Sequence, residues 1–217
     1  MTSGGSVSSY NQTKQKLLTA LQYEPTKHKY ALKGFIVPNV TSVIDRFLPF
    51  DRGAPTEVLE AARERGTIVH QLTAKLDRHE WTLVLEDDTR LAGFDGYIQA
   101  WEAFLLETNA QIEAIEQRVY NDKYRYAGTL DRIVRLDGKL VILEIKTGLL
   151  YPSYKWQTAA YQEAFNEGRM DEKATGRLAV QLKVDGKYHL EWHKSGADFD
   201  AFKGALAITN WENENGI

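Results

Sequence analysis

The chain has 217 residues, of which 43% are hydrophobic and 26% charged, so it is long enough to bury one substantial core. It contains no cysteine, which excludes disulfide bonds, cysteine-ligated zinc, iron–sulfur clusters and a cysteine nucleophile. Its net charge is −3, so a nucleic acid would have to be bound by a local basic patch rather than by the field of the whole protein.

The N-terminal segment does not have the pattern expected of a secretory signal. Residues 1–12 are rich in Ser and Gly and contain neither a basic nor an apolar signal region. No run of about 18 apolar residues occurs anywhere that could cross a membrane. We therefore expect a flexible segment over residues 1–12 and a single domain over residues 13–217 of a soluble, intracellular protein.

The N-terminal half is predicted to be mainly helical. Apolar spacing and capping residues predict helices over residues 13–22, 41–47, 55–79 and 94–107, with one strand over residues 33–37. Thr41 or Ser42 is expected to cap the second of these helices. Gly66 lies in the middle of the third, where glycine costs about 1 kcal/mol relative to alanine, so this glycine needs an explanation of its own, such as the close approach of another backbone.

The C-terminal half is predicted to alternate strands with helices. Runs rich in Ile, Val, Leu, Tyr and Thr predict strands over residues 112–120, 124–136 and 140–147, followed by a helix over residues 153–166. A strand pair over residues 177–184 and 187–193 and a last helix over residues 198–212 complete the chain. This order predicts an α/β fold with a central mixed sheet flanked by helices.

Asp137-Gly138 between two strand-forming runs is a strong hairpin signal. If these two residues form the turn, Leu136 is opposite Lys139, and the same register places Asp131 directly across from Glu144. Their Cβ atoms would then be about 4.5–5.5 Å apart. Because side chains alternate along a strand, Lys146 is expected on the same face as both carboxylates.

Two carboxylates facing each other across a sheet destabilise it unless something compensates. A hard cation such as Mg²⁺ would reverse the sign of that interaction, and Lys146 beside it could orient or deprotonate an attacking water or neutralise charge on a phosphate. The alternative is a surface hairpin with solvated charges. Glu144 follows the apolar run of residues 140–143, which is typical of a buried strand, but spacing alone leaves both interpretations open.

Residues on neighbouring segments are candidates for supporting roles. Gln157 and Tyr161 are four residues apart and share a helix face, which could point at the site or simply pack into the core. His70 could bind a metal but could also be an ordinary core or surface residue. Glu116 could add a carboxylate to the metal site but could also be simply solvated. Residues 118–139 interleave tyrosines with Lys and Arg, which suits single-stranded nucleic acid but also suits a charged sheet edge.

Taken together, four motifs resemble those of the PD-(D/E)XK nuclease superfamily, most closely its RecB-like branch: Gly66-x-x-x-His70, Gly128-Thr129-x-Asp131, Glu144-Ile145-Lys146-Thr147 and Gln157-x-x-x-Tyr161. Leu130 stands where the family name has proline. Residues 38–44, 96–98 and 185–186 extend the resemblance to phage and bacterial exonucleases and to the mitochondrial genome maintenance exonuclease. The resemblance implies a restriction-endonuclease-like αβββαβ core and cleavage of DNA phosphodiesters that leaves 5′-phosphates.

The resemblance also implies a metal site and its catalytic residues. Asp131 and Glu144 would ligate Mg²⁺ or Mn²⁺ together with the backbone carbonyl of Ile145, and His70 would bind or position a metal. Asp131, Glu144 and Lys146 would be catalytic, with Lys146 as the catalytic lysine. No iron–sulfur cluster of the kind some relatives hold is possible here.

Substrate contacts are expected from four further residues. Gln157 and Tyr161 would orient Lys146 and the DNA strand, and Thr147 and Arg132 are additional candidates for substrate binding. Glu116 would support the metal site or add a carboxylate to it.

The expected function is that of a metal-dependent DNA exonuclease acting in replication, recombination or repair, in the cytoplasm of a bacterial or phage-infected cell. DNA is the expected partner, with single strands favoured over duplex, and no membrane is involved. The alternatives are a double-strand-specific phage recombination exonuclease, a structure-specific endonuclease, and a DNA-binding protein that has lost its chemistry.

Overall fold

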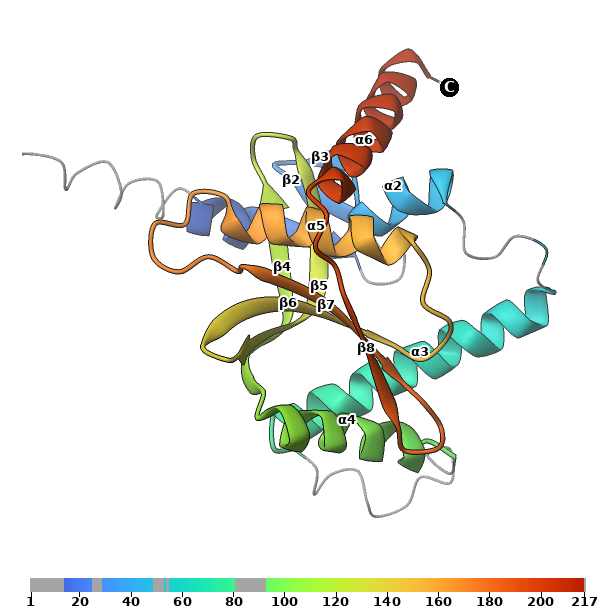
Figure 1. Ribbon diagram of the computed structural model, residues 1–217. Coiled ribbons are helices and arrows are strands. Elements are labelled where there is room, and N and C mark those ends of the chain that lie inside the picture. Colours follow the sequence, from blue (N-terminus) through green and yellow to red (C-terminus); the bar gives the residue numbers. More distant parts are fainter. Residues whose placement is uncertain (1–13, 25–28, 49–52, 54, 81–92, 217) are drawn as a thin grey trace, which may run out of the picture.

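The computed structural model describes residues 14–24, 29–48, 53, 55–80 and 93–216 (Figure 1). The flexible segment expected over residues 1–12 lies outside the described residues. After a short helix over residues 14–20, the described elements follow in chain order. They are β1 (Leu21–Glu24), β2 (Lys29–Leu32), β3 (Phe35–Val37), α2 (Val40–Phe47), α3 (Thr56–Asp77), α4 (Asp95–Thr108), β4 (Gln111–Asn121), β5 (Tyr126–Leu136), β6 (Lys139–Lys146), α5 (Ser153–Asn166), β7 (Gly176–Leu182), β8 (Tyr188–Trp192) and α6 (Ala197–Asn215).

A five-stranded sheet in the order β4-β5-β6-β7-β8 forms the centre of the fold. β6 and β7 run parallel, and the other neighbouring pairs are antiparallel. The helix α5 connects the two parallel strands, as a crossover must. Helices α2, α5 and α6 lie on one side of this sheet and α3 and α4 on the other (Figure 1). The predicted mixed α/β architecture is therefore confirmed.

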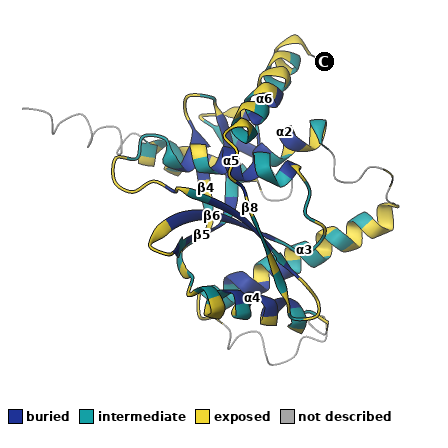
Figure 2. Cartoon of the chain, in the orientation of Figure 1, coloured by how far each residue is buried: buried dark blue, intermediate teal, exposed yellow. Residues whose placement is uncertain are grey.

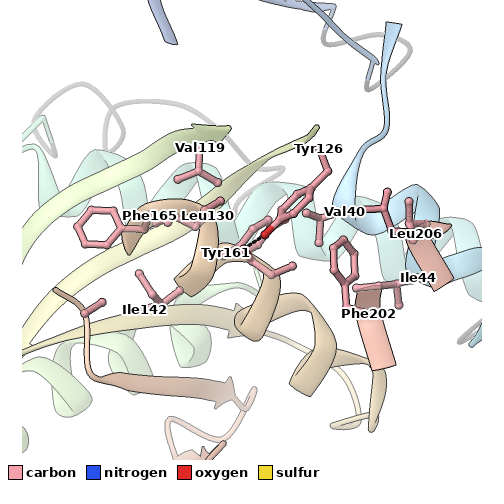
Figure 3. Packing of buried hydrophobic residues seen from close by; sticks show 14 of the residues in the cluster. Val40, Ile44, Val119, Tyr126, Leu130, Ile142, Tyr161, Phe165, Phe202 and Leu206 are labelled. Carbon is pink, nitrogen blue, oxygen red and sulfur yellow. Dashed lines mark hydrogen bonds between the residues drawn. The ribbon is translucent and has the colours of Figure 1, made fainter. Parts of the chain in front are cut away.

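The core consists of two apolar layers, one on each face of the sheet. Alternate residues of β6 point to opposite faces, so Leu140 and Ile142 pack beneath α5 while Val141 and Leu143 pack against α4. On the α5 side, Tyr126 donates a hydrogen bond to the carbonyl oxygen of Ala160 at 2.8 Å within this packing (Figure 3). Figure 2 shows the consequence, a buried central sheet with helices exposed on their outer sides.

The strands β1, β2 and β3 form a separate antiparallel sheet that the sequence pattern does not predict. The predicted helix over 13–22 ends at residue 20, and the predicted strand over 33–37 begins at Phe35. Buried Leu21, Tyr30 and Val37 pack this small sheet against β4 and β5. Its strands have three or four residues each, too few for an alternating pattern to stand out.

Two local expectations in the N-terminal half are wrong. The cap of α2 is Asn39, whose Oδ1 accepts a hydrogen bond from the Thr41 N–H at 3.0 Å, so neither Thr41 nor Ser42 caps it. Outside α3 itself, the nearest described atom to a Cβ built on Gly66 would be Thr147 Oγ1 at 4.0 Å, so the close approach of another described backbone does not explain this glycine. Among the described residues, none of the helices combines the length and hydrophobicity that a membrane crossing requires.

Candidate active site

The hairpin of β5 and β6 has the predicted register, with Leu136 opposite Lys139 and Arg132 opposite Leu143. Asp137 and Gly138 form its turn with φ angles of 48° and 75°, as a type I′ turn requires. The paired residues end at Arg132 and Leu143, one step before Asp131 and Glu144. The two carboxylates therefore lie where the strands part.

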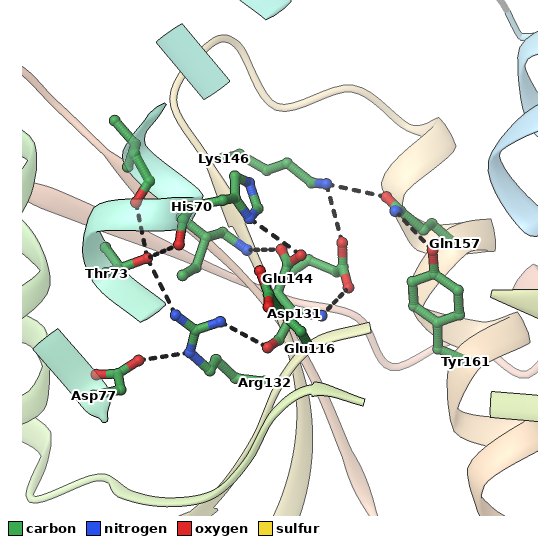
Figure 4. Close-up of polar contacts among 12 residues, drawn as sticks. His70, Thr73, Asp77, Glu116, Asp131, Arg132, Glu144, Lys146, Gln157 and Tyr161 are labelled. Carbon is green, nitrogen blue, oxygen red and sulfur yellow. Dashed lines mark hydrogen bonds and ion pairs between the residues drawn. The ribbon is translucent and has the colours of Figure 1, made fainter. Parts of the chain in front are cut away.

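Each carboxylate satisfies a backbone N–H of the opposite strand (Figure 4). The N–H of Asp131 donates to Glu144 Oε1 at 3.1 Å, and the N–H of Ile145 donates to Asp131 Oδ2 at 2.8 Å. These bonds replace the regular ladder at this point and hold both acids in the sheet. Glu144 is 1% exposed, which excludes the solvated-hairpin interpretation for this residue.

Lys146 is held by three side chains at the end of β6. Its ammonium donates to Glu144 Oε2 at 3.2 Å and to Gln157 Oε1 at 3.1 Å, and it lies over the ring of Tyr154 at 4.4 Å from the centroid. Gln157 in turn donates through Nε2 to the hydroxyl of Tyr161 at 3.4 Å. The α5 side chains therefore fix the direction of Lys146.

His70 reaches the same point from α3 on the other side of the sheet. Its Nδ1 is 3.2 Å from Asp131 Oδ1. Burial alone would lower the pKa of His70, but the Asp131 carboxylate outweighs it and raises that pKa. For Asp131, burial alone would raise the pKa, but the charges of His70 and Lys146 hold the pKa of this carboxyl well below its usual range.

The pKa values of the two carboxylates are shifted in opposite directions. Burial, followed by the neighbouring negative charge of Asp131, raises the pKa of Glu144 to about 7. For Lys146, burial acts to lower the pKa, and Glu144 reverses this and raises it. The site thus concentrates two acids and a cationic partner in a buried place, where a compensating positive charge is strongly favoured.

The donor set fits a hard divalent cation. Mg²⁺ is commonly bound by one or two carboxylates, with water and substrate phosphate completing its shell. Asp131 and Glu144 supply these carboxylates, and a cation would relieve both the burial of the Glu144 charge and its repulsion by Asp131, which together raise the pKa of Glu144. Within the described ranges, no three His, Cys, Asp or Glu side chains are already arranged around one point, so a bound ion would exchange some existing hydrogen bonds for its own.

The structure does not support substrate contact by Arg132. Its side chain is fully buried, and its Nε donates to Asp77 Oδ2 at 2.6 Å on the α3 side of the sheet. Its Nη1 donates to the carbonyl oxygen of Asp131 at 2.8 Å, and Nη2 donates to Thr73 Oγ1 at 3.2 Å. Arg132 therefore supports the backbone of Asp131 and does not present its side chain at the surface.

The remaining predicted residues have different surroundings. Tyr161 is 2% exposed, so it supports Gln157 rather than facing open solvent. Glu116 is half exposed and paired with Arg78 at 2.9 Å, and its φ of 49° breaks the regular strand at this position. Thr147 follows Lys146 and lines a cleft beside α3. Their predicted roles toward metal and DNA stay predictions.

The basic and aromatic segment over residues 118–139 is not an open stacking surface. Tyr120 and Tyr126 are 3% and 0% exposed, and both belong to the core. Arg135 is paired with Glu113 and Glu172 on the surface. Of the three tyrosines in this segment, Tyr120, Tyr124 and Tyr126, two are therefore unavailable to a ligand.

Sequence reasoning missed Tyr154, whose ring contacts Lys146. The sequence could have predicted that Tyr154 lies beside Gln157 and Tyr161, because residues 154, 157 and 161 have the spacing of one helix face. Tyr154 also lines a cleft of about 450 Å³ between α3 and the segment after β6, which reaches His70 and Lys146.

A mixed five-stranded sheet, with acids and a lysine where its central antiparallel strands part, defines a protein of the restriction-endonuclease-like fold class. The model of the PD-(D/E)XK nuclease superfamily matches residues 45–207, most of the chain. The chain therefore belongs to the PD-(D/E)XK nuclease superfamily, as the four motifs predict.

Comparison with solved structures agrees on the fold. A protein of Eubacterium rectale named as a candidate exonuclease superposes with a TM-score of 0.53 at 11% identity, covering 83% of this chain and 82% of that one. An alkaline exonuclease from Laribacter hongkongensis gives a TM-score of 0.46 at 14% identity, covering 82% of this chain and 88% of its own, a likeness that supports nothing further. No curated protein matches the sequence.

Proposed function

We propose that the chain is a Mg²⁺- or Mn²⁺-dependent deoxyribonuclease that hydrolyses phosphodiester bonds, acting as an exonuclease on the ends of single-stranded DNA. The observation that carries this proposal is the convergence of Asp131, Glu144 and Lys146 at the point where β5 and β6 part. Membership in a nuclease superfamily supports the reaction class. A role in replication, recombination or repair, in the cytoplasm of a bacterial or phage-infected cell, would accompany that activity.

The acidic side chains have the role of binding the cation in this proposal. Asp131 and Glu144 hold it, with the Ile145 carbonyl and His70 as further predicted ligands. A bound divalent cation supplies Lewis-acid polarisation of a phosphoryl oxygen and stabilisation of the leaving 3′-oxygen. Arg132 keeps the Asp131 peptide in place through its bond to the Asp131 carbonyl.

Lys146 has the role of the charged group beside the phosphate. Its ammonium already lies between Glu144 and Gln157, so it needs little rearrangement to orient an attacking water or to neutralise charge developing on phosphorus. Gln157 restricts the rotamers of Lys146 and Tyr161 supports Gln157, which favours one productive geometry.

Single-stranded ends are the preferred substrate in this proposal because the net charge of −3 does not suit a broad duplex-binding face. A confined basic cleft beside Lys146 suits a flexible strand better. Duplex-specific exonuclease and structure-specific endonuclease activity are the alternatives that the same assay separates.

The test is a digestion series with 5′- and 3′-labelled single-stranded and duplex DNA and a single-stranded circle, with Mg²⁺, Mn²⁺ or EDTA. We expect metal-dependent release of short products from linear single strands and no cut in the circle. Lys146→Ala should lower turnover at least about a hundredfold. Lys139→Ala, at the exposed start of the same strand, should cleave like the wild type.

Equal cleavage by Lys146→Ala and wild type would refute the site assignment. Cutting of the circle would replace the exonuclease by an endonuclease, and preference for duplex ends would replace the single-strand preference. Absence of cleavage on every DNA substrate with both metals would leave a non-catalytic DNA-binding protein.

A further inference from the structure

A cleft beside α3 leads from the surface to Lys146; we call it the α3 groove. It has a volume of about 450 Å³ and lies between the N-terminal half of α3 and the segment that joins β6 to α5, which passes alongside α3 in Figure 1. Its lining residues are Val58, Leu59, Ala62, Arg63, Arg65, Gly66, His70, Ile145, Lys146, Thr147, Gly148, Leu149, Tyr151 and Tyr154.

The charged side chains that line the α3 groove within the described part of the chain are all basic. They are Arg63, Arg65 and Lys146, and none of the described lining residues is Asp or Glu, although the whole chain has 30 acidic and 27 basic residues. Two larger hollows elsewhere on the described surface are lined by charges of both signs. A concave wall with cations alone selects an anionic ligand by its electrostatic potential.

Arg65 is the cation best placed to bind such a ligand. Its Nε is buried with no hydrogen-bond partner, and its guanidinium makes no ion pair with any described residue. A guanidinium binds phosphate through two parallel hydrogen bonds, which makes it well suited to a nucleic-acid backbone. A phosphate at the guanidinium of Arg65 would give this side chain an anionic partner that the described residues do not supply.

Aromatic and apolar side chains form the rest of the groove. Lys146 covers a face of Tyr154, so Tyr154 is already engaged. Tyr151 meets Tyr154 edge to face, with ring centroids 6.0 Å apart and planes at 81°, and is itself half-buried on the groove wall. Leu149, 70% exposed, adds apolar surface beside it. Such a surface binds unpaired bases, because every base offers an aromatic face.

We propose that the α3 groove is the subsite for the single-stranded nucleotides next to the scissile bond, with Arg65 binding a backbone phosphate and Tyr151 stacking on a base. This inference rests on the proposed nuclease function and names what selects its substrate. Continuity with the candidate active site supports it, because Lys146 and His70 also line this groove. A base inside a duplex is covered on both faces by its neighbours, so stacking on Tyr151 requires it to be unpaired.

The test measures binding without cleavage. Labelled 12-nucleotide single-stranded DNA and the matching blunt duplex are titrated in EDTA, and polarisation gives Kd for the wild type and its variants. Arg65→Gln should weaken single-strand binding about tenfold and reduce the slope of log Kd against log salt by about 0.7. Tyr151→Leu should weaken it about tenfold, and Tyr151→Phe should retain wild-type affinity.

Lys187→Gln is the control, because it removes one charge from a side chain that is 77% exposed and outside the groove. If Arg65→Gln and Tyr151→Leu bind as Lys187→Gln does while the wild type cleaves DNA, the groove assignment is wrong and the proposed function stands. Equal losses on single strand and duplex would refute single-strand selection. A wild type that neither binds nor cleaves DNA overturns both proposals.

Discussion

Gly128 on β5 lies directly against the ring of Tyr161 on α5, and a Cβ at this position would overlap Cε1 of that ring. The contact links two of the four sequence motifs through packing alone. Because Tyr161 accepts a hydrogen bond from Gln157, and Gln157 accepts one from Lys146, the glycine sets the position of the whole chain of side chains.

Replacing Gly128 by alanine should therefore force Tyr161 or β5 to move. We expect Gly128→Ala to lower the free energy of unfolding by about 1–3 kcal/mol, since overpacking a tight core costs this much. Gly204→Ala is the matched control, because that α6 glycine has nothing within 4 Å of a built Cβ and should gain about 0.4–1 kcal/mol. Urea denaturation checks both, and equal stability of Gly128→Ala and wild type would contradict the overlap.

The hydrogen bond between Gln157 and Lys146 predicts a change in turnover. Gln157→Leu keeps the volume of the buried side chain but leaves the ammonium without its α5 acceptor. We expect kcat to fall about tenfold with little change in KM, as for loss of a hydrogen bond to a charged group. Gln162→Leu removes a hydrogen bond to the Ala174 carbonyl from the same helix and should leave kcat unchanged. Steady-state kinetics that give both variants the same kcat would exclude a positioning role for Gln157.

The buried pair of Arg132 and Asp77 predicts a large effect on stability. Arg132→Met should lower the free energy of unfolding by about 3–5 kcal/mol, because it leaves the Asp77 carboxylate buried without its cation. The double variant Arg132→Met with Asp77→Asn should recover part of this loss, since the amide keeps an acceptor for the Trp101 indole N–H. Arg135→Met, on the same strand but in surface ion pairs, should cost less than about 1 kcal/mol. Similar denaturation midpoints for Arg132→Met and Arg135→Met would contradict this account.

Local signals in the sequence predict much of the C-terminal half of the fold. The Asp137-Gly138 turn determines the β5–β6 register, and the predicted helix over residues 153–166 has the bounds of α5. Such features depend on neighbours in sequence, so residue type and spacing reveal them. The same register brought Asp131 and Glu144 together, but the pattern did not reveal that the strands part there.

Long-range packing accounts for what the sequence did not reveal. The local pattern around Arg132 is typical of an exposed strand residue. Its burial depends on an ion pair with Asp77, which is distant in sequence. The small sheet of β1, β2 and β3 exists because Leu21 and Tyr30 find a surface on β4 and β5 to pack against. Local propensity cannot predict either contact, because both depend on which segments the fold brings side by side.

His193 predicts a pH dependence of stability that is separate from the candidate site. Its side chain is 1% exposed, with Nδ1 and Thr158 Oγ1 2.8 Å apart, and burial lowers the pKa of His193 to about 4. Arg177 and Lys155 also lower this pKa, while Glu191 opposes them. In the unfolded chain the pKa is about 6.5, so between these two values the unfolded state holds a proton that the folded state lacks.

Stability from His193 should therefore be complete above about pH 6.5 and lost as the pH falls toward 4. Between pH 7 and pH 5 we expect this group to remove about 1–2 kcal/mol from the free energy of unfolding. His193→Asn cannot gain the proton, so its unfolding free energy should vary less with pH over this range. His189→Asn, at an exposed position of β8 four residues earlier in the chain, should keep the wild-type dependence. Urea titrations at each pH measure the difference, and parallel curves for wild type and His193→Asn would show that His193 is not the titrating group.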